Sequence, residues 1–192
     1  SVSFGEQVIA DLPVLDLSGQ TCLPGLIDMH THILEAGNTA DLSQIFKHTL
    51  ESTLATGKEM SLVTLKAGFT AVRNVGTYYG MAEFQLRDLI NAGEVIGPRM
   101  QAAGFYLTIP GGGGDLLTPG IKESDIPSYL HLGIARGAEQ FRQKAQLAVD
   151  SGADLLKLIA SGAVLAYGGV PGAPEMTPEE IEAKEKKEVN RL

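Results

Sequence analysis

The sequence has only one cysteine, Cys22, among its 192 residues. An intrachain disulfide framework is therefore excluded. This usage fits a reducing compartment and we expect a cytoplasmic protein, although a secreted protein without disulfides would have the same composition. Long apolar runs are also missing. None approaches the roughly 18–20 residues that a membrane helix needs, so we expect no membrane partner.

Basic residues are few as well, with 15 Lys and Arg against 23 Asp and Glu and a formal net charge of −8. The densest basic cluster, from Lys184 to Arg191, is interleaved with Glu185 and Glu188. A protein that binds nucleic acid needs a basic surface to neutralise phosphates, so we expect no nucleic-acid partner. The remaining composition, with 44% hydrophobic and 20% charged residues, is typical of a globular protein with one sizeable core.

Short apolar runs alternate with helical patterns along residues 23–192, which is typical of a parallel sheet built from βα units. The predicted strands are residues 26–30, 70–75, 99–107 and 153–159. The predicted helices are residues 43–66 with an irregularity at Gly57, residues 81–91, residues 135–151, and one that starts at Thr177 as N-cap with Pro178 and Glu180 behind it. Four such units are half of a (β/α)8 TIM-type barrel, which typically needs about 250 residues. We expect an α/β fold with the first four units of such a barrel; a smaller open α/β sheet is the competing interpretation.

The first 22 residues have a different pattern. Residues 7–10 and 14–17 are short strand-like pieces, with a turn at Ser18 and Gly19. They are too few to close a sheet. We therefore interpret residues 1–22 as the remnant of a small β-sandwich domain and residues 23–192 as a separate barrel unit.

Two histidines lie at the carboxyl end of the first predicted strand, in the run LPGLIDMHTHI, residues 23–33. Side chains at i and i+2 of a strand point the same way, so His30 and His32 share one face. The carboxyl ends of parallel strands are where α/β folds place their sites. Two imidazoles at this spacing can hold one divalent ion. The alternative is a pair of hydrogen-bonded histidines at a strand end.

Lys157 lies inside the apolar run ADLLKLI, residues 153–159. A parallel strand is covered on both faces, so an ammonium group there must reach an anion, escape to solvent or lose its charge. A neutral lysine can add carbon dioxide and become a carbamate, an oxygen ligand able to bridge two metals. The alternatives are a lysine that extends to solvent, one that binds a phosphate, and a Schiff-base lysine in an aldolase-like barrel.

Five stretches of the sequence, in order along the chain, resemble the same known family. They are LPGLIDMHTHI at 23–33, GFTAVRNVG at 68–76, GPRMQAAGFYLTIPGGGGD at 97–115, GADLLKLIASGAV at 152–164 and PGAPEMTPEEI at 171–181. Together they resemble the metal-dependent amidohydrolase superfamily. The resemblance is strongest to the branch with imidazolonepropionase-like enzymes, Xaa-Pro dipeptidases and Lys/Arg carboxypeptidase-like peptidases.

This resemblance implies a metal site. Its His-x-His motif falls on His30 and His32, and its carboxylated lysine falls on Lys157, so the expected cofactors are one or two Zn²⁺ ions and a carbamate formed from carbon dioxide. The remaining histidine ligands and the general-base aspartate are expected beyond residue 192. The implied reaction is hydrolysis of an amide bond in a dipeptide or N-acyl amino acid by metal-activated water. Hydrolysis of a cyclic amide of the imidazolone type is the alternative.

Substrate contacts are expected in the loops that follow the strands. Relatives often have Gly-Gly-His-Gly where this chain has glycine at 111–114, so Gly113 stands in the place of a histidine. His131 and Tyr167 are further candidates by position alone. We expect a small-molecule amide or dipeptide as the substrate. An alternative of another class is an incomplete metal-binding half-barrel, inactive without a complementary chain or self-association into an oligomer.

Overall fold

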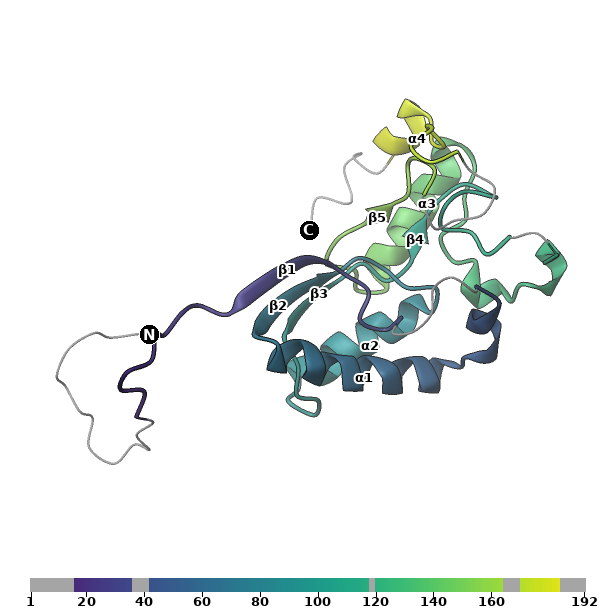
Figure 1. Cartoon of the computed structure of the whole chain (residues 1–192). Coiled ribbons are helices and arrows are strands. Elements are labelled where there is room, and N and C mark those ends of the chain that lie inside the picture. The colour runs from purple at the N-terminus through teal and green to yellow at the C-terminus, as the bar shows by residue number, and fades with distance from the viewer. Residues whose placement is uncertain (1–15, 36–41, 118–119, 164–169, 184–192) are drawn as a thin grey trace.

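The computed structural model describes residues 16–35, 42–117, 120–163 and 170–183 (Figure 1). Within these residues every named strand pairs in parallel with its neighbour. One sheet has the order β1-β2-β3 and a second pairs β4 with β5. The strands are β1 (Leu26–Thr31), β2 (Phe69–Asn74), β3 (Arg99–Ala102), β4 (Tyr106–Leu107) and β5 (Lys157–Leu158). The expected alternation of parallel strands and helices is confirmed. The strand-like piece at 7–10 lies outside the described residues, and of the piece at 14–17 only residues 16 and 17 are described, which form no strand.

Helices pack against both sheets. Helices α1 and α2 pack together under β2 and β3, and α3 packs beside β4 (Figure 1). The helical elements are η1 (Leu42–Lys47), α1 (Leu50–Lys66), α2 (Gly80–Asn91), η2 (Glu123–Asp125), η3 (Ser128–Leu130), α3 (Gly137–Asp150) and α4 (Pro178–Glu182). Among the described residues no helix is long and apolar enough to cross a bilayer.

The segment predicted as one helix over residues 43–66 is divided into η1 and α1, so that prediction was wrong in its start. Thr49 has an extended backbone, with φ −119° and ψ 167°, and its side chain accepts a hydrogen bond from the Ser52 N–H. The Ser52 hydroxyl in turn accepts from the Thr49 N–H at 2.8 Å. This capping box starts a new helix at residue 50.

Gly57 does not interrupt α1, contrary to the expected irregularity. A Cβ atom there would lie 2.8 Å from Leu86 Cδ2 and 3.1 Å from Leu34 Cγ. The glycine therefore lets α1 lie close to α2 and to the chain that follows β1. Leu34 and Leu86 belong to the buried core, together with Val72, Ala102, Leu107, Leu116 and Phe141.

The third predicted strand, residues 99–107, is broken into β3 and β4. Gly104 has φ +84°, which a β-branched or bulky residue rarely adopts, and a Cβ atom there would lie 2.3 Å from Phe84 Cζ. The chain thus leaves the first sheet at residues 103–105 and enters the second. The fourth predicted strand, 153–159, keeps only Lys157 and Leu158 as a strand. The start of the last helix is confirmed, since Thr177 and Glu180 form a capping box and a proline follows the cap.

Asp154 connects the two sheets. Its N–H donates to the Ala102 carbonyl at 2.8 Å, and its Oδ2 accepts from the Ala102 N–H at 2.9 Å. Three residues later Lys157 pairs with Tyr106. The segment leading into β5 therefore contacts the end of β3 through Asp154 and then pairs regularly with β4.

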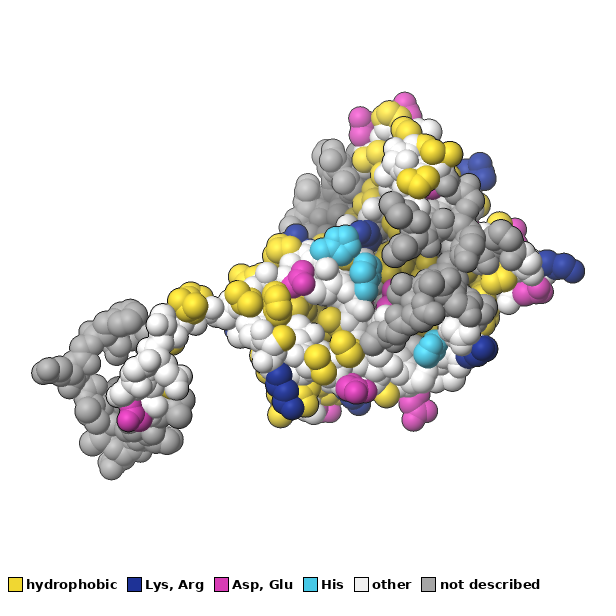
Figure 2. All heavy atoms as spheres, viewed as in Figure 1, with side chains coloured by type: hydrophobic (Ala, Val, Ile, Leu, Met, Phe, Trp, Pro, Cys, Tyr) yellow, Lys and Arg dark blue, Asp and Glu magenta, His cyan; other side chains and the backbone are white. Residues whose placement is uncertain are grey.

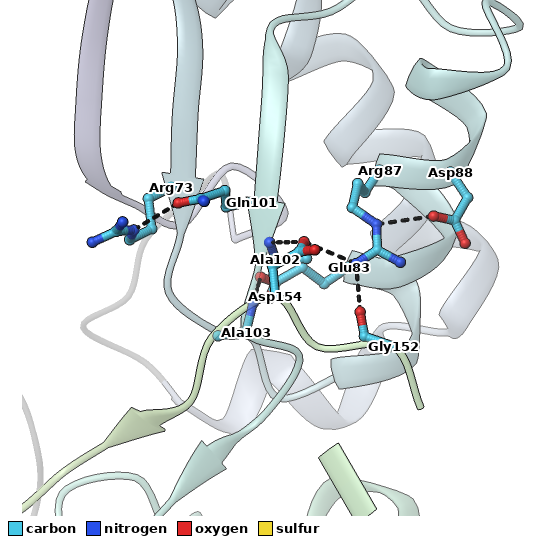
Figure 3. A network of polar contacts seen from close by, with 9 residues as sticks. All are labelled: Arg73, Glu83, Arg87, Asp88, Gln101, Ala102, Ala103, Gly152 and Asp154. Atoms are coloured by element: carbon cyan, nitrogen blue, oxygen red, sulfur yellow. Dashed lines mark hydrogen bonds and ion pairs between the residues drawn. The ribbon is translucent and has the colours of Figure 1, made fainter. Parts of the chain in front are cut away.

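Arg87 of α2 holds Asp154 in this position (Figure 3). Its Nη1 lies 2.9 Å from Asp154 Oδ2 and 2.5 Å from the Gly152 carbonyl, while its Nε lies 2.9 Å from Asp88 Oδ1. The Arg87 side chain is only 12% exposed, whereas that of Asp88 is 65% exposed. Water screens the pair with Asp88, so we expect the contacts with Asp154 and Gly152 to contribute most to stability.

Glu83 is a fully buried carboxylate on α2, directed at the turn after β3 (Figure 3). Its Oε1 accepts from the Ala103 N–H at 2.7 Å, and its Oε2 has no hydrogen-bond partner among the described residues. Burial raises the pKa of Glu83 to about 8 from an ordinary value of 4.5. The folded protein therefore keeps this carboxyl protonated at neutral pH.

This burial predicts how stability depends on pH. Between pH 4.5 and about 8 the folded protein keeps a proton that the unfolded chain releases, so the free energy of unfolding falls by up to about 1.4 kcal/mol per pH unit. In Glu83→Gln, which resembles the protonated acid, we expect this part of the fall to disappear in urea titrations across that range. The exposed Glu59→Gln is the control and should keep it. An unchanged pH slope in Glu83→Gln would contradict this account.

Candidate metal centre

His30 and His32 lie together where β1 ends, and Figure 2 shows two histidine side chains side by side on that surface. Their ring centroids are 5.4 Å apart, with the rings edge to face. Thr31, between them, donates instead to the Arg73 carbonyl at 3.2 Å. The alternation of a strand thus brings the two imidazoles together, as the spacing predicts.

The carbonyl of Gly76 determines the tautomer of His32. His32 Nδ1 lies 2.9 Å from the Gly76 oxygen. A carbonyl can only accept a hydrogen bond, so Nδ1 carries the proton and Nε2 keeps a free lone pair. A neutral imidazole with one nitrogen bonded to a carbonyl and the other free is the common state of a metal-binding histidine.

Gly76 can place its carbonyl there only because it is a glycine. Its φ is +103°, in the region that favours glycine, and a Cβ atom would lie 2.8 Å from Cε1 and 2.9 Å from Cδ1 of Tyr106. The absent side chain leaves room for the Tyr106 ring beside His32. The two ring centroids are 5.9 Å apart.

Lys157 of β5 is half-buried and lies opposite Tyr106 in the parallel pairing. Burial lowers the pKa of its ammonium group. The pKa of His30 is lowered too, first by burial and then by the positive charge of Lys157 and by His32. Burial and the positive charge of Lys157 thus act in the same direction on His30. Both groups are shifted toward the neutral forms that bind metals.

The described residues form only part of a metal site. They contain no group of three or more His, Cys, Asp or Glu side chains placed to hold a metal ion. Two imidazoles and a lysine fit a divalent metal in donor type and protonation, but they do not complete a tetrahedral set without further ligands or a modified lysine.

The glycine tract that follows β4 is held by two carboxylates. Asp115 accepts from the Gly111 N–H at 2.8 Å, and Glu175 accepts from the Gly113 N–H at 2.9 Å. The other oxygen of Asp115 lies 3.1 Å from His131 Nε2. Gly113 and His131 therefore lie in one ordered region, and their predicted substrate contacts stay predictions. Tyr167 lies outside the described residues.

Sequence reasoning missed three residues of this site: Glu35, Gly76 and Tyr106. Glu35 and Gly76 follow the carboxyl ends of β1 and β2, where α/β folds gather functional side chains, and Tyr106 begins the short strand β4. This position was the available signal. Their contacts with His32 depend on the alignment of three strands, which the sequence pattern does not specify.

A family model for amidohydrolases matches residues 21–190. The chain belongs to the amidohydrolase family. Ochratoxinase of Aspergillus niger is 29% identical, over 83% of this chain and 35% of its own length. A solved Xaa-Pro dipeptidase with methionine bound in its active site is 31% identical with a TM-score of 0.70, over 84% of this chain and 39% of that one. Another solved amidohydrolase is 26% identical with a TM-score of 0.81, over 93% and 44%.

This amidohydrolase chain therefore spans less than half the length of the relatives it matches. The likeness to their structures confirms parallel strands with helices as part of the amidohydrolase fold. β1 is an edge strand of its sheet, and its residues Leu26, Ile27 and Met29 are each more than half exposed. This exposure agrees with a chain that forms only part of the amidohydrolase fold.

Substitution of Gly76 tests the support of His32. In Gly76→Ala we expect the free energy of unfolding to fall by more than about 1 kcal/mol, because both the left-handed backbone and the contact with Tyr106 become unfavourable. We also expect weaker zinc binding, since the carbonyl must move away from His32.

Gly93→Ala is the matched control. Gly93 has φ +76° and nothing within 4 Å of its Cβ position, so it shares the backbone cost without the contact. Chemical denaturation and a zinc competition assay measure the two effects. Equal losses of stability and unchanged zinc affinity in both variants would contradict the role of Gly76.

Proposed function

We propose that the chain supplies the first four βα units of a (β/α)8 barrel and the His30, His32 and Lys157 half of its divalent metal site. In this proposal the protein is a metal-dependent amidohydrolase that cleaves an amide bond of a dipeptide or N-acyl amino acid. The observation that carries it is the hydrogen bond from His32 Nδ1 to Gly76, which leaves Nε2 free beside His30. Membership of the amidohydrolase family supports the reaction class.

The three side chains have distinct tasks in this proposal. His30 and His32 would hold Zn²⁺ or a similar ion through neutral imidazole nitrogens. The lowered pKa of Lys157 favours a neutral amine, whose Nζ can add carbon dioxide and release a proton, giving a carbamate that offers anionic oxygens as ligands. When bound, the metal would polarise the scissile carbonyl and lower the pKa of a water molecule. The general-base aspartate is expected beyond residue 192.

The substrate class rests on the likeness to a Xaa-Pro dipeptidase and to ochratoxinase. We propose a small amide with an amino-acid leaving group, bound near Gly113 and His131. Because the chain spans less than half of these relatives, we propose that catalysis also needs a complementary chain segment, or association of several chains, against the exposed edge of β1.

Metal content tests the site itself. Protein purified without chelator should carry near one zinc-like ion per chain by inductively coupled plasma mass spectrometry. We expect His30→Ala to lose that ion, because one of two adjacent imidazoles is removed. His48→Ala is the control, since His48 is exposed and outside the site, and it should keep the metal. Absence of metal in all three proteins, or equal content in all three, would contradict the proposed site.

Hydrolysis assays test the substrate class. We expect metal-loaded protein to release amino acid from Xaa-Pro dipeptides faster than it opens a cyclic amide, and a chelator to stop both reactions. A higher rate on the cyclic amide would favour an imidazolone-type activity. Metal binding without hydrolysis of either substrate would support the half-barrel that is inactive alone. Borohydride trapping of a carbonyl substrate on Lys157 without metal would contradict the proposal.

A further inference from the structure

The hydroxyl of Tyr106 lies between the side chains of His32 and Glu35, whose backbones are joined by a hydrogen bond from the Glu35 N–H to the His32 carbonyl at 3.0 Å. Its oxygen is 3.2 Å from His32 Nδ1, 3.1 Å from Glu35 Oε1 and 3.1 Å from the Gly76 carbonyl. Tyr106 is buried. Among the described residues, this hydroxyl therefore forms hydrogen bonds only with groups of the candidate metal centre and its supports.

The protons of this network can be assigned from its acceptors. His32 must carry a proton on Nδ1 because the Gly76 carbonyl only accepts. The Tyr106 oxygen can therefore only accept a hydrogen bond from the His32 Nδ1–H. The single proton of the tyrosine is then free for another acceptor, and a carboxylate is a stronger one than a carbonyl. The order is therefore His32 Nδ1–H to Tyr106, and Tyr106 O–H to Glu35.

Glu35 is itself held in place for this contact. Its Oε1 also accepts from the Tyr78 N–H at 3.1 Å, and the Tyr78 ring packs edge to face on Tyr106 at 5.2 Å. Among the described residues no lysine, arginine or histidine forms an ion pair with Glu35. Its negative charge is thus available to polarise the tyrosine rather than being neutralised locally.

We propose that Glu35 and Tyr106 are positioning residues that hold His32 as a single neutral tautomer with Nε2 free to bind a divalent metal. The inference rests on the proposed metal site and adds a carboxylate–tyrosine–histidine chain to it. Carboxylates that support a metal-binding histidine directly raise the basicity of the ligand and hold its ring orientation. Here the tyrosine stands between the carboxylate and the histidine, and Gly76 adds a second acceptor.

Tyr106→Phe removes the hydroxyl and keeps the ring. We expect its zinc affinity, measured by competition with a chromogenic chelator, to fall about 10- to 100-fold. Tyr78→Phe is the matched control: it removes a hydroxyl from the neighbouring ring but keeps the backbone N–H that binds Glu35, and its zinc affinity should equal that of wild type. Glu35→Gln retains an acceptor oxygen without the charge, so we expect it to recover part of the affinity that Glu35→Ala loses.

Nitrogen NMR of the imidazole rings gives a second readout that needs no metal. Wild type and Tyr78→Phe should show His32 with its proton on Nδ1, whereas Tyr106→Phe, which keeps the Gly76 acceptor but loses the tyrosine, should show a larger share of the Nε2-protonated tautomer. If wild type binds zinc, an affinity of Tyr106→Phe equal to that of Tyr78→Phe overturns the inference. If wild type binds no zinc, the proposed metal site fails, and the tautomer comparison decides this inference alone: a larger share of the Nε2-protonated tautomer in Tyr106→Phe than in wild type supports it, and an unchanged share overturns it.

Discussion

The hydrogen bond between His32 Nδ1 and the Gly76 carbonyl is the contact on which the candidate site depends. It joins the carboxyl ends of β1 and β2, whose pairing brings Thr31 beside Asn74. It also determines which nitrogen of His32 is free. The contact requires a residue without a side chain and with positive φ at position 76, and the space so released holds the Tyr106 ring. Gly76 thus accepts the hydrogen bond of His32, favours one of its tautomers and leaves space for the Tyr106 ring.

Local patterns in the sequence predicted much of this arrangement. Alternation along β1 places His30 beside His32, and the capping box at Thr177 depends only on neighbouring residues. The parallel βα order also follows from the pattern of apolar runs. The histidine pair and the helix cap are predictable because the interactions that produce them span a few residues. The parallel order is predictable because the same alternation of strand and helix recurs in each βα unit.

The features that could not be predicted depend on contacts between distant segments. Tyr106 meets Glu35 across a separation of 71 residues, and Asp154 pairs with Ala102 in place of a regular strand. The break at Gly104 follows from the approach of Phe84, which the sequence pattern does not specify. Glu83 is likewise acidic in sequence but neutral in the fold, because α2 carries it into the interior.

The central claim is that two histidines of β1 bind one divalent metal through nitrogen. Zinc K-edge X-ray absorption on the zinc-loaded protein tests this most directly, because it identifies the atoms around the metal. We expect a shell that includes two imidazole nitrogens at about 2.0–2.1 Å, and we expect any zinc that His30→Ala still binds to lack this pair of nitrogens. A shell without imidazole nitrogen, or one that His30→Ala leaves unchanged, would contradict the claim.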